Sequence, residues 1–535
     1  MRTGAHLARR GGLLSQATLP GAVAAIRELF SGARTPSQIY RIHAANSPQR
    51  TALVWRDRRL TYAELDARMD RARAGLLRLG VRRGDRVVLM MRNRPEFIEA
   101  QLGAGRIGAA VVSASWRSAP PEIAYVLAHS GAKALVFEAD LWPNVERATA
   151  GTADAGGVRL VAVGGAPPGC KRYEEDLLSG GSSPREDSRR AEQDASVIVY
   201  TSGTTGAPKG AVRTFSKESV YAFLHFVAQT PMRADDVHLV ACPLYHSTAL
   251  GFMTMSALLG ARIVLMDEFK PEAFLEAIER EGVTTTAVVP TMLHRVLALD
   301  PGARARHDLR SLRAVFCGGA PLPGPLALQA LDFFGDVLFN FYGATETGLV
   351  TLAGPADLRS APGTIGRPVP GNEVRLLDDS GREVGDGAVG ELYVRNEMLI
   401  AGYDRDPGAT RASMRDGFFS VGDLARRDRR GRYFIEGRKR EMILSGGVNV
   451  YPAEIEAVLE SHPDVAEAAV VGVPDADFGE RVRAVIARRA GSTLEAAAVL
   501  AWCRERLSGA KLPREIVFVD ALPRNAMGKV LKREL

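Results

Sequence analysis

Tyr200-Thr201-Ser202-Gly203-Thr204-Thr205-Gly206-Ala207-Pro208-Lys209-Gly210 follows directly on Ser196–Tyr200, whose apolar and β-branched composition predicts a buried strand. Gly203 and Gly206 let the backbone turn sharply, so that successive N–H groups can point at one anion. Four hydroxyls and the ammonium of Lys209 add further donors and a positive charge. A strand that ends in such a loop predicts a phosphate site.

Two other interpretations of this stretch are disfavoured. The P-loop pattern GxxxxGK[ST] does not fit, because the spacing and the final hydroxyl differ. A flexible linker rich in Ser, Thr and Gly is not expected to follow a buried strand directly and to end in Pro208-Lys209-Gly210. We therefore interpret the segment as a phosphate-binding loop.

The chain on both sides of this loop alternates between helices and strands. Thr61 and Glu64 form a capping-box pattern ahead of the amphipathic run Tyr62–Leu79. The apolar runs that predict buried strands are Arg86–Met91, Ala109–Ser113, Ala134–Phe137, Leu160–Val163, Val237–Ala241, Arg262–Met266, Thr284–Val289, Leu312–Phe316 and Val337–Phe341. This alternation indicates an α/β architecture with largely parallel sheets.

The pattern changes after Gly363. Short strands at Glu373–Leu377, Gly390–Val394 and Gly431–Ile435 indicate a small β-rich subdomain. A chain of 535 residues is also too long for one core, since single cores stop growing at about 250–300 residues. We predict a basic N-terminal tail over residues 1–34, a large domain over 35–436, a hinge over 437–440 and a small α+β domain over 441–535.

The composition is that of an ordinary globular protein, with 46% hydrophobic and 24% charged residues. The net charge of +7 is a mild excess of positive charge that would attract anionic ligands such as nucleotides. The sequence has no basic block interleaved with aromatic residues, so nucleic acid binding is not expected. The four cysteines are far apart and form no CxxC pair, so we expect no disulfide framework or structural zinc site. A reducing compartment, the cytoplasm, is the expected location.

Further motifs follow along the chain. Asn340-Phe341-Tyr342-Gly343-Ala344-Thr345-Glu346-Thr347-Gly348 ends an apolar strand and supplies a carboxylate, which beside a phosphate loop can hold Mg²⁺. Cys317-Gly318-Gly319-Ala320-Pro321 ends the preceding strand. The later motifs are Gly417–Asp423, Gly437–Glu441, Ser445–Pro452 and Leu522–Lys529.

These motifs together resemble the adenylate-forming superfamily of acyl-CoA synthetases, luciferases and peptide synthetase adenylation domains. The resemblance runs from about Thr35 to the C-terminus and is strongest to fatty acyl-CoA synthetases. It implies a large N-terminal domain of two α/β sheets plus a β-barrel, followed by a small mobile domain. It also implies that ATP and Mg²⁺ activate a carboxylic acid as acyl-AMP, and that coenzyme A then takes the acyl group.

The resemblance assigns a role to each motif. Tyr342 would stack on adenine, Asp423 would accept from the ribose hydroxyls, and Glu346 together with Thr201 would bind Mg²⁺. The residues that would contact ATP or AMP are Thr201, Ser202, Gly203, Thr204, Thr205, Gly206, Lys209, Gly319, Ala320, Pro321, Asn340, Tyr342, Asp423 and Arg438.

The resemblance also implies three catalytic residues and a tunnel for coenzyme A. Lys529 would place a compact positive charge between the attacking carboxylate and the α-phosphate. Thr345 would touch the α-phosphate, and His246 would close the carboxylate end of the acyl pocket. Gly446 and Gly447 would line the pantetheine tunnel after the small domain rotates. One departure is that Thr214-Phe215 stands where many relatives carry a histidine.

The identity of the acid and of the acyl acceptor is less determined. Ala249, Gly251 and Met253 suggest an alkyl tunnel, so we expect a medium- or long-chain fatty acid. An aryl or coumarate ligase remains the alternative. A ligase that feeds a carrier protein is disfavoured, because Gly366-Arg367-Pro368 follows the Tyr342–Gly348 motif without an insertion. A non-catalytic nucleotide-binding protein is disfavoured by the presence of Glu346 and Lys529.

The N-terminal segment stands apart from these motifs. Residues 1–27 contain four arginines and no acid, and small and polar residues interrupt any signal-peptide core. We expect a partly helical basic tail that is dispensable for the chemistry. The alternatives are an organelle transit peptide and a peripheral membrane contact through Leu13, Leu14, Val23, Ile26, Leu29 and Phe30. The sequence does not determine the oligomeric state.

Overall fold

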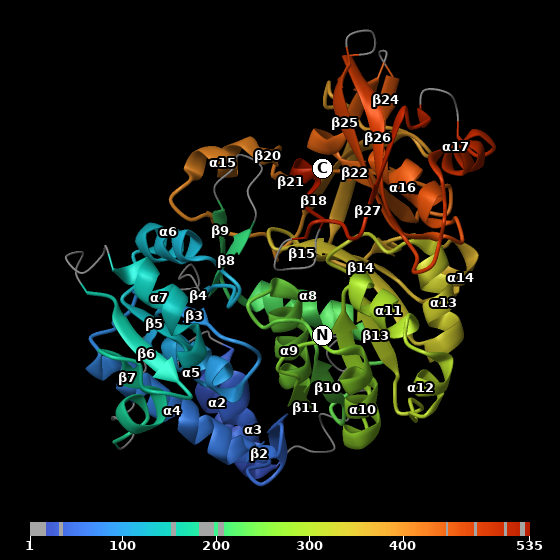
Figure 1. Ribbon diagram of the computed structural model, residues 1–535. Helices are drawn as coiled ribbons and strands as arrows, with labels where there is room; N and C mark the ends of the chain where they lie inside the picture. The colour runs from blue at the N-terminus through green and yellow to red at the C-terminus, as the bar shows by residue number, and fades with distance from the viewer. Residues whose placement is uncertain are drawn as a thin grey trace.

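The computed structural model describes residues 18–30, 36–150, 157–180, 197–201, 208–445, 448–475, 479–507, 511–524 and 530–535. It confirms the α/β architecture, with a large N-terminal part below a smaller C-terminal part in Figure 1. Each strand expected from an apolar run is present, with its ends within three residues of the expectation. The capping box is also confirmed, because the Glu64 amide donates to the Thr61 hydroxyl at 3.2 Å and the Thr61 amide donates to the Glu64 carboxylate at 2.8 Å.

Two large sheets form the N-terminal part. In the eight-stranded sheet the order is β19 (Gly402–Tyr403), β9 (Lys209–Arg213), β8 (Val197–Thr201), β4 (Ala110–Ser113), β3 (Arg86–Met90), β5 (Ala134–Glu138), β6 (Arg159–Val163) and β7 (Lys171–Arg172). In the nine-stranded sheet it is β16 (Arg367–Pro368), β15 (Gly348–Ala353), β14 (Leu338–Ala344), β13 (Ala314–Cys317), β12 (Thr285–Val288), β10 (Val237–Val240), β11 (Arg262–Leu265), β1 (Thr51–Trp55) and β2 (Arg58–Thr61). Both are mostly parallel, and central strands such as β4, β5, β12 and β13 are buried on both faces.

One hydrophobic core joins the two sheets. It contains Leu53 and Ile263 from the nine-stranded sheet and Val87 and Val136 from the eight-stranded sheet, all at most 1% exposed. The helices in this core are α4 (Tyr62–Arg78), α5 (Pro95–Ile107) and α9 (Ser247–Leu259). The large part therefore behaves as one packed body.

Two smaller sheets follow, one antiparallel and one mixed. The β-rich subdomain is a five-stranded sheet of β17 (Glu373–Leu377), β18 (Val389–Arg395), β21 (Phe418–Arg427), β20 (Met414–Arg415) and β22 (Tyr433–Arg438). The C-terminal sheet contains β23 (Ile443–Ser445), β24 (Val448–Val450), β25 (Val465–Asp475), β26 (Gly479–Arg488) and β27 (Glu515–Val519), beside α16 (Pro452–Glu460) and α17 (Ala496–Arg504). The expected hinge starts inside β22, because Gly437 and Arg438 still pair with β21.

Part of the N-terminal tail is attached to the large domain. Helix α2 (Leu19–Phe30) lies against α3 (Ser37–Asn46), as Figure 1 shows. The Thr18 amide and hydroxyl both donate to the Asn46 side chain, at 2.8 and 3.0 Å. The described part of this segment is therefore a docked helix rather than a free tail.

The strand order places one crevice in each large sheet. In the nine-stranded sheet β10 is followed along the chain by its neighbour β11 and then by β12, which lies on the other side of β10. In the eight-stranded sheet β3 is followed by β4 on one side and β5 on the other. Ligands of open α/β sheets bind beyond the carboxyl ends of the strands at such reversals.

Candidate active site

The motif after β14 forms a tight turn into β15. Gly343 is required there, because an added Cβ would lie 2.0 Å from the Gly348 carbonyl oxygen. Gly348 has φ +69°, a conformation that glycine adopts without strain. The turn presents Thr345 and Glu346 at the carboxyl edge of the nine-stranded sheet.

Glu346 is held in place by its surroundings. It is 7% exposed, and the Tyr403 hydroxyl donates to its carboxylate at 3.1 Å. The Lys209 ammonium lies 5.3 Å from the centre of the Tyr403 ring. One tyrosine from β19 therefore connects the expected metal ligand to the end of the phosphate-binding loop.

Three of the expected nucleotide-binding residues are joined by polar contacts. The Tyr342 hydroxyl donates to the Asp423 carboxylate at 2.8 Å, and Arg438 pairs with the same carboxylate at 3.1 Å. Asp423 and Arg438 are direct partners across β21 and β22. Burial raises the pKa of Tyr342 well above its ordinary value, and the Asp423 carboxylate adds to the shift, so the hydroxyl remains a donor.

Thr345 and His246 both stand at the start of α9. The Thr345 hydroxyl lies 3.1 Å from the hydroxyl of Ser247, the first residue of that helix. Burial lowers the pKa of His246 to about 4, so the imidazole is neutral at physiological pH. Its buried Nε2 atom has no hydrogen-bond partner among the described residues. The imidazole thus offers a neutral donor or acceptor that no described residue of the protein uses.

The expected adenine loop is open to solvent, unlike its neighbour Asn340. Gly319, Ala320 and Pro321 follow β13 and are exposed. Asn340 is 1% exposed, and its side-chain amide donates to the Thr364 carbonyl at 2.8 Å. The side-chain nitrogen of Asn340 is therefore already used in a hydrogen bond within the protein.

The remaining site predictions lie outside the described residues. They concern Ser202, Gly203, Thr204, Thr205, Gly206, Gly446, Gly447, Lys529 and the side chain of Thr201. Cys317, by contrast, is described and is 0% exposed, so the expected adenine loop starts from a buried strand end.

Arg213, on β9, is a functional candidate that the motifs did not indicate. Its guanidinium donates to the backbone carbonyl of Thr345 and, at 3.0 Å, to that of Met398. Burial lowers the pKa of Arg213, and the nearby Glu346 carboxylate opposes the shift. A lone arginine after the apolar Ala211-Val212 pair was the available signal in the sequence. It holds the turn that carries the expected metal ligand.

We expect Arg213→Met to impair catalysis through this turn. Two carbonyls would lose a buried donor, which typically costs about 1–3 kcal/mol, and Glu346 would lose its compensating charge. Turnover should fall about tenfold and saturate at higher Mg²⁺ concentration. Arg213→Lys should recover part of the Mg²⁺ response, because a lysine restores a donor to the carbonyls of the turn without the planar fork. Unchanged Mg²⁺ saturation in Arg213→Met would leave the arginine a purely structural role.

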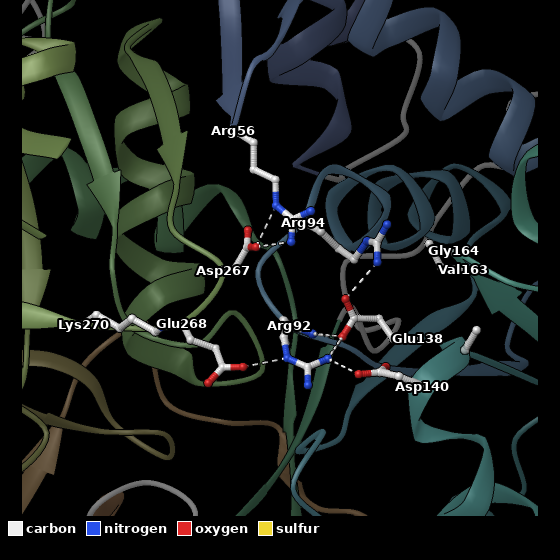
Figure 2. A pocket seen from close by; sticks show the side chains of 11 residues that line it. Arg56, Arg92, Arg94, Glu138, Asp140, Val163, Gly164, Asp267, Glu268 and Lys270 are labelled. Carbon is white, nitrogen blue, oxygen red and sulfur yellow. Dashed lines mark hydrogen bonds and ion pairs between the residues drawn. The ribbon is translucent and has the colours of Figure 1, made fainter. Parts of the chain in front are cut away.

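The crevice of the eight-stranded sheet is lined by charged residues that form ion pairs. A cavity of about 530 Å³ lies at the carboxyl ends of β3, β5 and β6, and its charged lining is shown in Figure 2. Arg92 pairs there with Glu138, Asp140 and Glu268, at 2.5, 2.9 and 2.7 Å. The charged side chains that line the cavity are therefore largely paired with one another.

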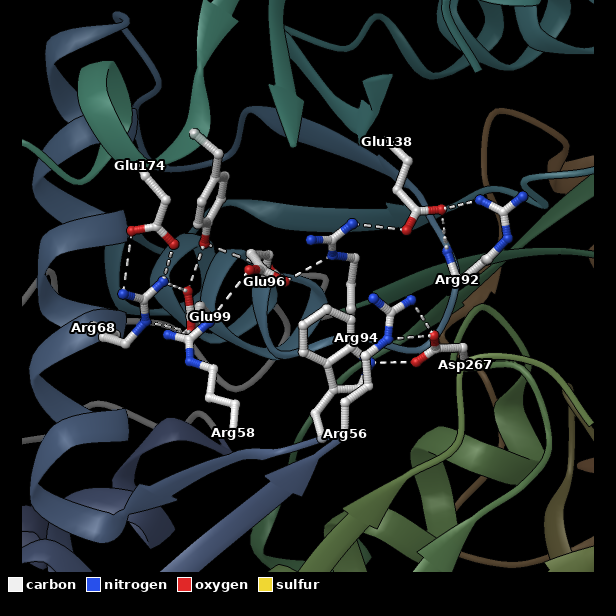
Figure 3. Close-up of polar contacts among 12 residues, drawn as sticks. Arg56, Arg58, Arg68, Arg92, Arg94, Glu96, Glu99, Glu138, Glu174 and Asp267 are labelled. Atoms are coloured by element: carbon white, nitrogen blue, oxygen red, sulfur yellow. Dashed lines mark hydrogen bonds and ion pairs between the residues drawn. The ribbon is translucent and has the colours of Figure 1, made fainter. Parts of the chain in front are cut away.

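The ion pairs continue inward from this cavity, as Figure 3 shows. Arg94 joins Glu138 to Glu96, and Arg68 pairs with Glu99, whose side chain is fully buried. Breaking a buried pair by removing one partner is costly, so such a network holds its elements in register. We interpret this ion-pair network as a structural contact between the two sheets of the large domain. We interpret the crevice beside His246 as the active site.

Comparison with known proteins identifies relatives of this chain along most of its length. A sequence model described as AMP-binding enzyme matches residues 40–404, and one described as AMP-binding enzyme C-terminal domain matches residues 454–529. Feruloyl-CoA synthase from an Amycolatopsis species is 38% identical, over 92% of this chain and 96% of its own. Long-chain-fatty-acid–CoA ligase FadD13 from Mycobacterium tuberculosis is 34% identical, over 90% and 93%. The crystal structure of the anthranilate CoA ligase AuaEII with anthranoyl-AMP superposes with a TM-score of 0.87 at 26% identity, over 95% and 97%.

Proposed function

Because this chain belongs to the AMP-binding enzyme family, we propose that it joins an aromatic carboxylic acid to coenzyme A. At the coarser level it is an adenylate-forming acid–CoA ligase that uses ATP, Mg²⁺ and coenzyme A. The observation that carries the site assignment is that one turn after β14 joins Tyr342, which is hydrogen-bonded to Asp423, to Thr345, which contacts Ser247 next to His246.

The reaction has two steps. A carboxylate oxygen attacks the α-phosphorus of ATP, and pyrophosphate leaves, giving acyl-AMP. The thiol sulfur of coenzyme A then attacks the acyl carbon, and AMP and the thiol proton leave, giving the thioester. We assign adenosine to Tyr342, Asp423 and Arg438, and the reacting carboxylate to the space beside Thr345 and His246. In the first step the Lys529 ammonium would neutralise charge at the α-phosphate.

Mg²⁺ fits the donor set around Glu346. Mg²⁺ is usually held by one or two carboxylates together with substrate phosphates and water. No cluster of three or more metal-ligating side chains occurs among the described residues, which accords with such a shared site. Glu346, oriented by Tyr403 and by Arg213 behind its turn, would hold the ion, with Thr201 as the assigned second contact. The ion would neutralise phosphate charge.

The surroundings of α9 favour an aromatic acid over a long alkyl chain. Ala249 and Met253, which suggested an alkyl tunnel, are 2% and 3% exposed within the core that joins the sheets. Both side chains are almost completely buried by the protein, so they do not support an open tunnel. The partly exposed residues of the helix are Ser247, Thr248, Gly251, Thr254 and Leu258, and all of them except Leu258 are small or polar. Such a surface suits a short, flat acid with polar substituents.

A fatty acid remains the second candidate, because FadD13 shares 34% identity over nine-tenths of this chain. The deciding experiment is AMP release, dependent on coenzyme A, across ferulate, anthranilate, octanoate and palmitate. The aromatic proposal requires the highest kcat/KM for one of the aromatic acids. A clear preference for palmitate would move the assignment to fatty acids, and release without thioester formation would point to another acyl acceptor.

Gly251 offers a direct test of where the acid lies. A glycine inside a helix costs about 0.5–1 kcal/mol relative to alanine. Gly75 and Gly103 have neighbours at 2.1 and 3.0 Å that crowd an added side chain, whereas no described residue lies within 4 Å of a Cβ added at Gly251. The described residues therefore do not explain the glycine, but an acid that extends along α9 from His246 would.

We expect Gly251→Phe to shorten the acids that the enzyme accepts. It should lower kcat/KM for ferulate about tenfold or more while sparing acetate or propionate and the KM for ATP. Gly251→Ala is the matched control, and it should raise stability by about 0.5–1 kcal/mol. Equal losses for long and short acids in Gly251→Phe would exclude this path for the acid.

A further inference from the structure

We propose that α2 binds the surface of an anionic lipid membrane with its outward face. Large apolar side chains that are exposed in the described residues gather on this helix. Of six, three belong to α2: Leu19, Val23 and Ile26, at 79%, 57% and 57% exposure. Their spacing of four and three residues places them on one side of the helix. An amphipathic helix normally turns such a stripe towards a partner.

The opposite face of α2 is attached to the protein, which fixes the rotation of the helix. A Cβ added at Gly21 would lie 2.2 Å from the Asn46 carboxamide oxygen, so the helix approaches α3 closely there. Near the other end, the Gln38 side chain donates to the Glu28 carbonyl at 3.1 Å. The apolar stripe is therefore held outwards.

The charges of α2 favour lipid headgroups of negative charge. Glu28 is the only acid of the helix, and it is 8% exposed and paired with Arg41 at 3.7 Å. Arg27 is exposed, and residues 1–27 contain four arginines without any acid. A helix that combines exposed apolar side chains with the exposed Arg27, and that follows an acid-free stretch with three more arginines, matches the boundary between acyl chains and anionic headgroups.

A second copy of the chain fits this surface less well than a membrane does. A symmetric dimer through α2 would bring the same patch of each copy together, and with it the arginine-rich segments of both. Like charges at close range oppose that contact, whereas anionic lipids would neutralise them. In Figure 1, α2 also lies at the opposite end of the molecule from α16 and α17, so a membrane there would not obstruct the small domain.

Vesicle sedimentation of the full chain tests the proposal. The protein should bind vesicles of phosphatidylcholine with about 30% phosphatidylserine and should bind pure phosphatidylcholine much less. Binding should also fall as salt is raised, because the arginine contribution is screened. The triple variant Leu19→Ser, Val23→Ser, Ile26→Ser should lower the bound fraction about tenfold or more. Its turnover of a water-soluble acid and its Tm should stay unchanged.

The matched control changes exposed apolar side chains elsewhere. Tyr221→Ser with Met414→Ser removes two such side chains and should leave vesicle binding as it was. Equal binding of the native protein to neutral and anionic vesicles, or undiminished binding of the triple variant, would overturn the proposal. It would also be overturned if the native protein does not bind vesicles, or if the triple substitution converts a dimer into a monomer.

Discussion

Lys529→Ala is expected to abolish formation of acyl-AMP while leaving thioester synthesis from pre-made acyl-AMP intact. In the first step two anions approach each other, and a fixed positive charge between them lowers the barrier. Losing such a contact typically costs about 10²–10³ in rate or more. The thiol attack on acyl-AMP involves no such approach to a polyphosphate. Pyrophosphate release and thioester formation should therefore be measured separately.

The described flanks of residues 525–529 show how the segment is anchored. Arg524 pairs with Val530 in a β-bridge, and the Leu531 amide donates to the Pro523 carbonyl at 2.8 Å. Arg524 also pairs with Glu467 of β25 at 2.6 Å. The two flanks are thus fixed to each other and to the small domain. We propose that rotation of this domain about residues 437–440 brings Lys529 to the site and withdraws it again.

Gly447→Trp is the reciprocal variant. It should form acyl-AMP and release pyrophosphate, yet stall with coenzyme A, because a large side chain would fill the tunnel assigned to pantetheine. Opposite losses in the two variants would support alternation of the small domain. If Lys529→Ala loses both steps equally while folded, or if Gly447→Trp leaves thioester formation untouched, these assignments are wrong.

Glu346→Gln should have the second-largest effect, with turnover reduced about 10²–10³-fold at ordinary Mg²⁺ concentration. The amide keeps the shape of the side chain and can still pair with Tyr403, but it removes the negative charge that would hold the ion. Raising Mg²⁺ should restore part of the rate. Initial rates over a Mg²⁺ series, with Tm as a check on folding, give the measurement.

Tyr403→Phe is the control for this substitution. It removes one hydrogen bond to the Glu346 carboxylate at 3.1 Å but leaves its charge. Its effect on the Mg²⁺ response should have the same direction and be smaller, about tenfold. A full rate in Glu346→Gln would remove Glu346 from the metal site. A larger loss in Tyr403→Phe than in Glu346→Gln would assign the main role to the tyrosine.

Local pattern was sufficient to predict the strands and the motifs at their ends. The run Arg86–Met91 became β3 and Glu373–Leu377 became β17, because composition and periodicity report whether a residue is buried. Glycines were equally informative: Gly343 and Gly348 mark a turn that no larger residue fits. The α/β fold, its C-terminal domain and the family followed from these local features and their order.

Partners and directions of side chains could not be predicted in the same way. The apolar segment after His246 suggested a tunnel, but Ala249 and Met253 face the core, since the pattern reports burial without saying what buries a residue. The N-terminal segment suggested a tail, but its outward stripe was defined only when Gly21 and Glu28 were seen to face α3.

The sequence by itself determined which chemical groups this protein carries and at which strand ends they stand. Only the tertiary structure decided which of them touch. Tyr342 meets Asp423 across 81 positions, Glu346 meets Tyr403 across 57, and Arg213 meets the Thr345 carbonyl across 132. Such contacts depend on how separate sheets stack, and stacking is set by the shape of the shared core. A local pattern contains no record of that shape, because many packings bury the same residues equally well.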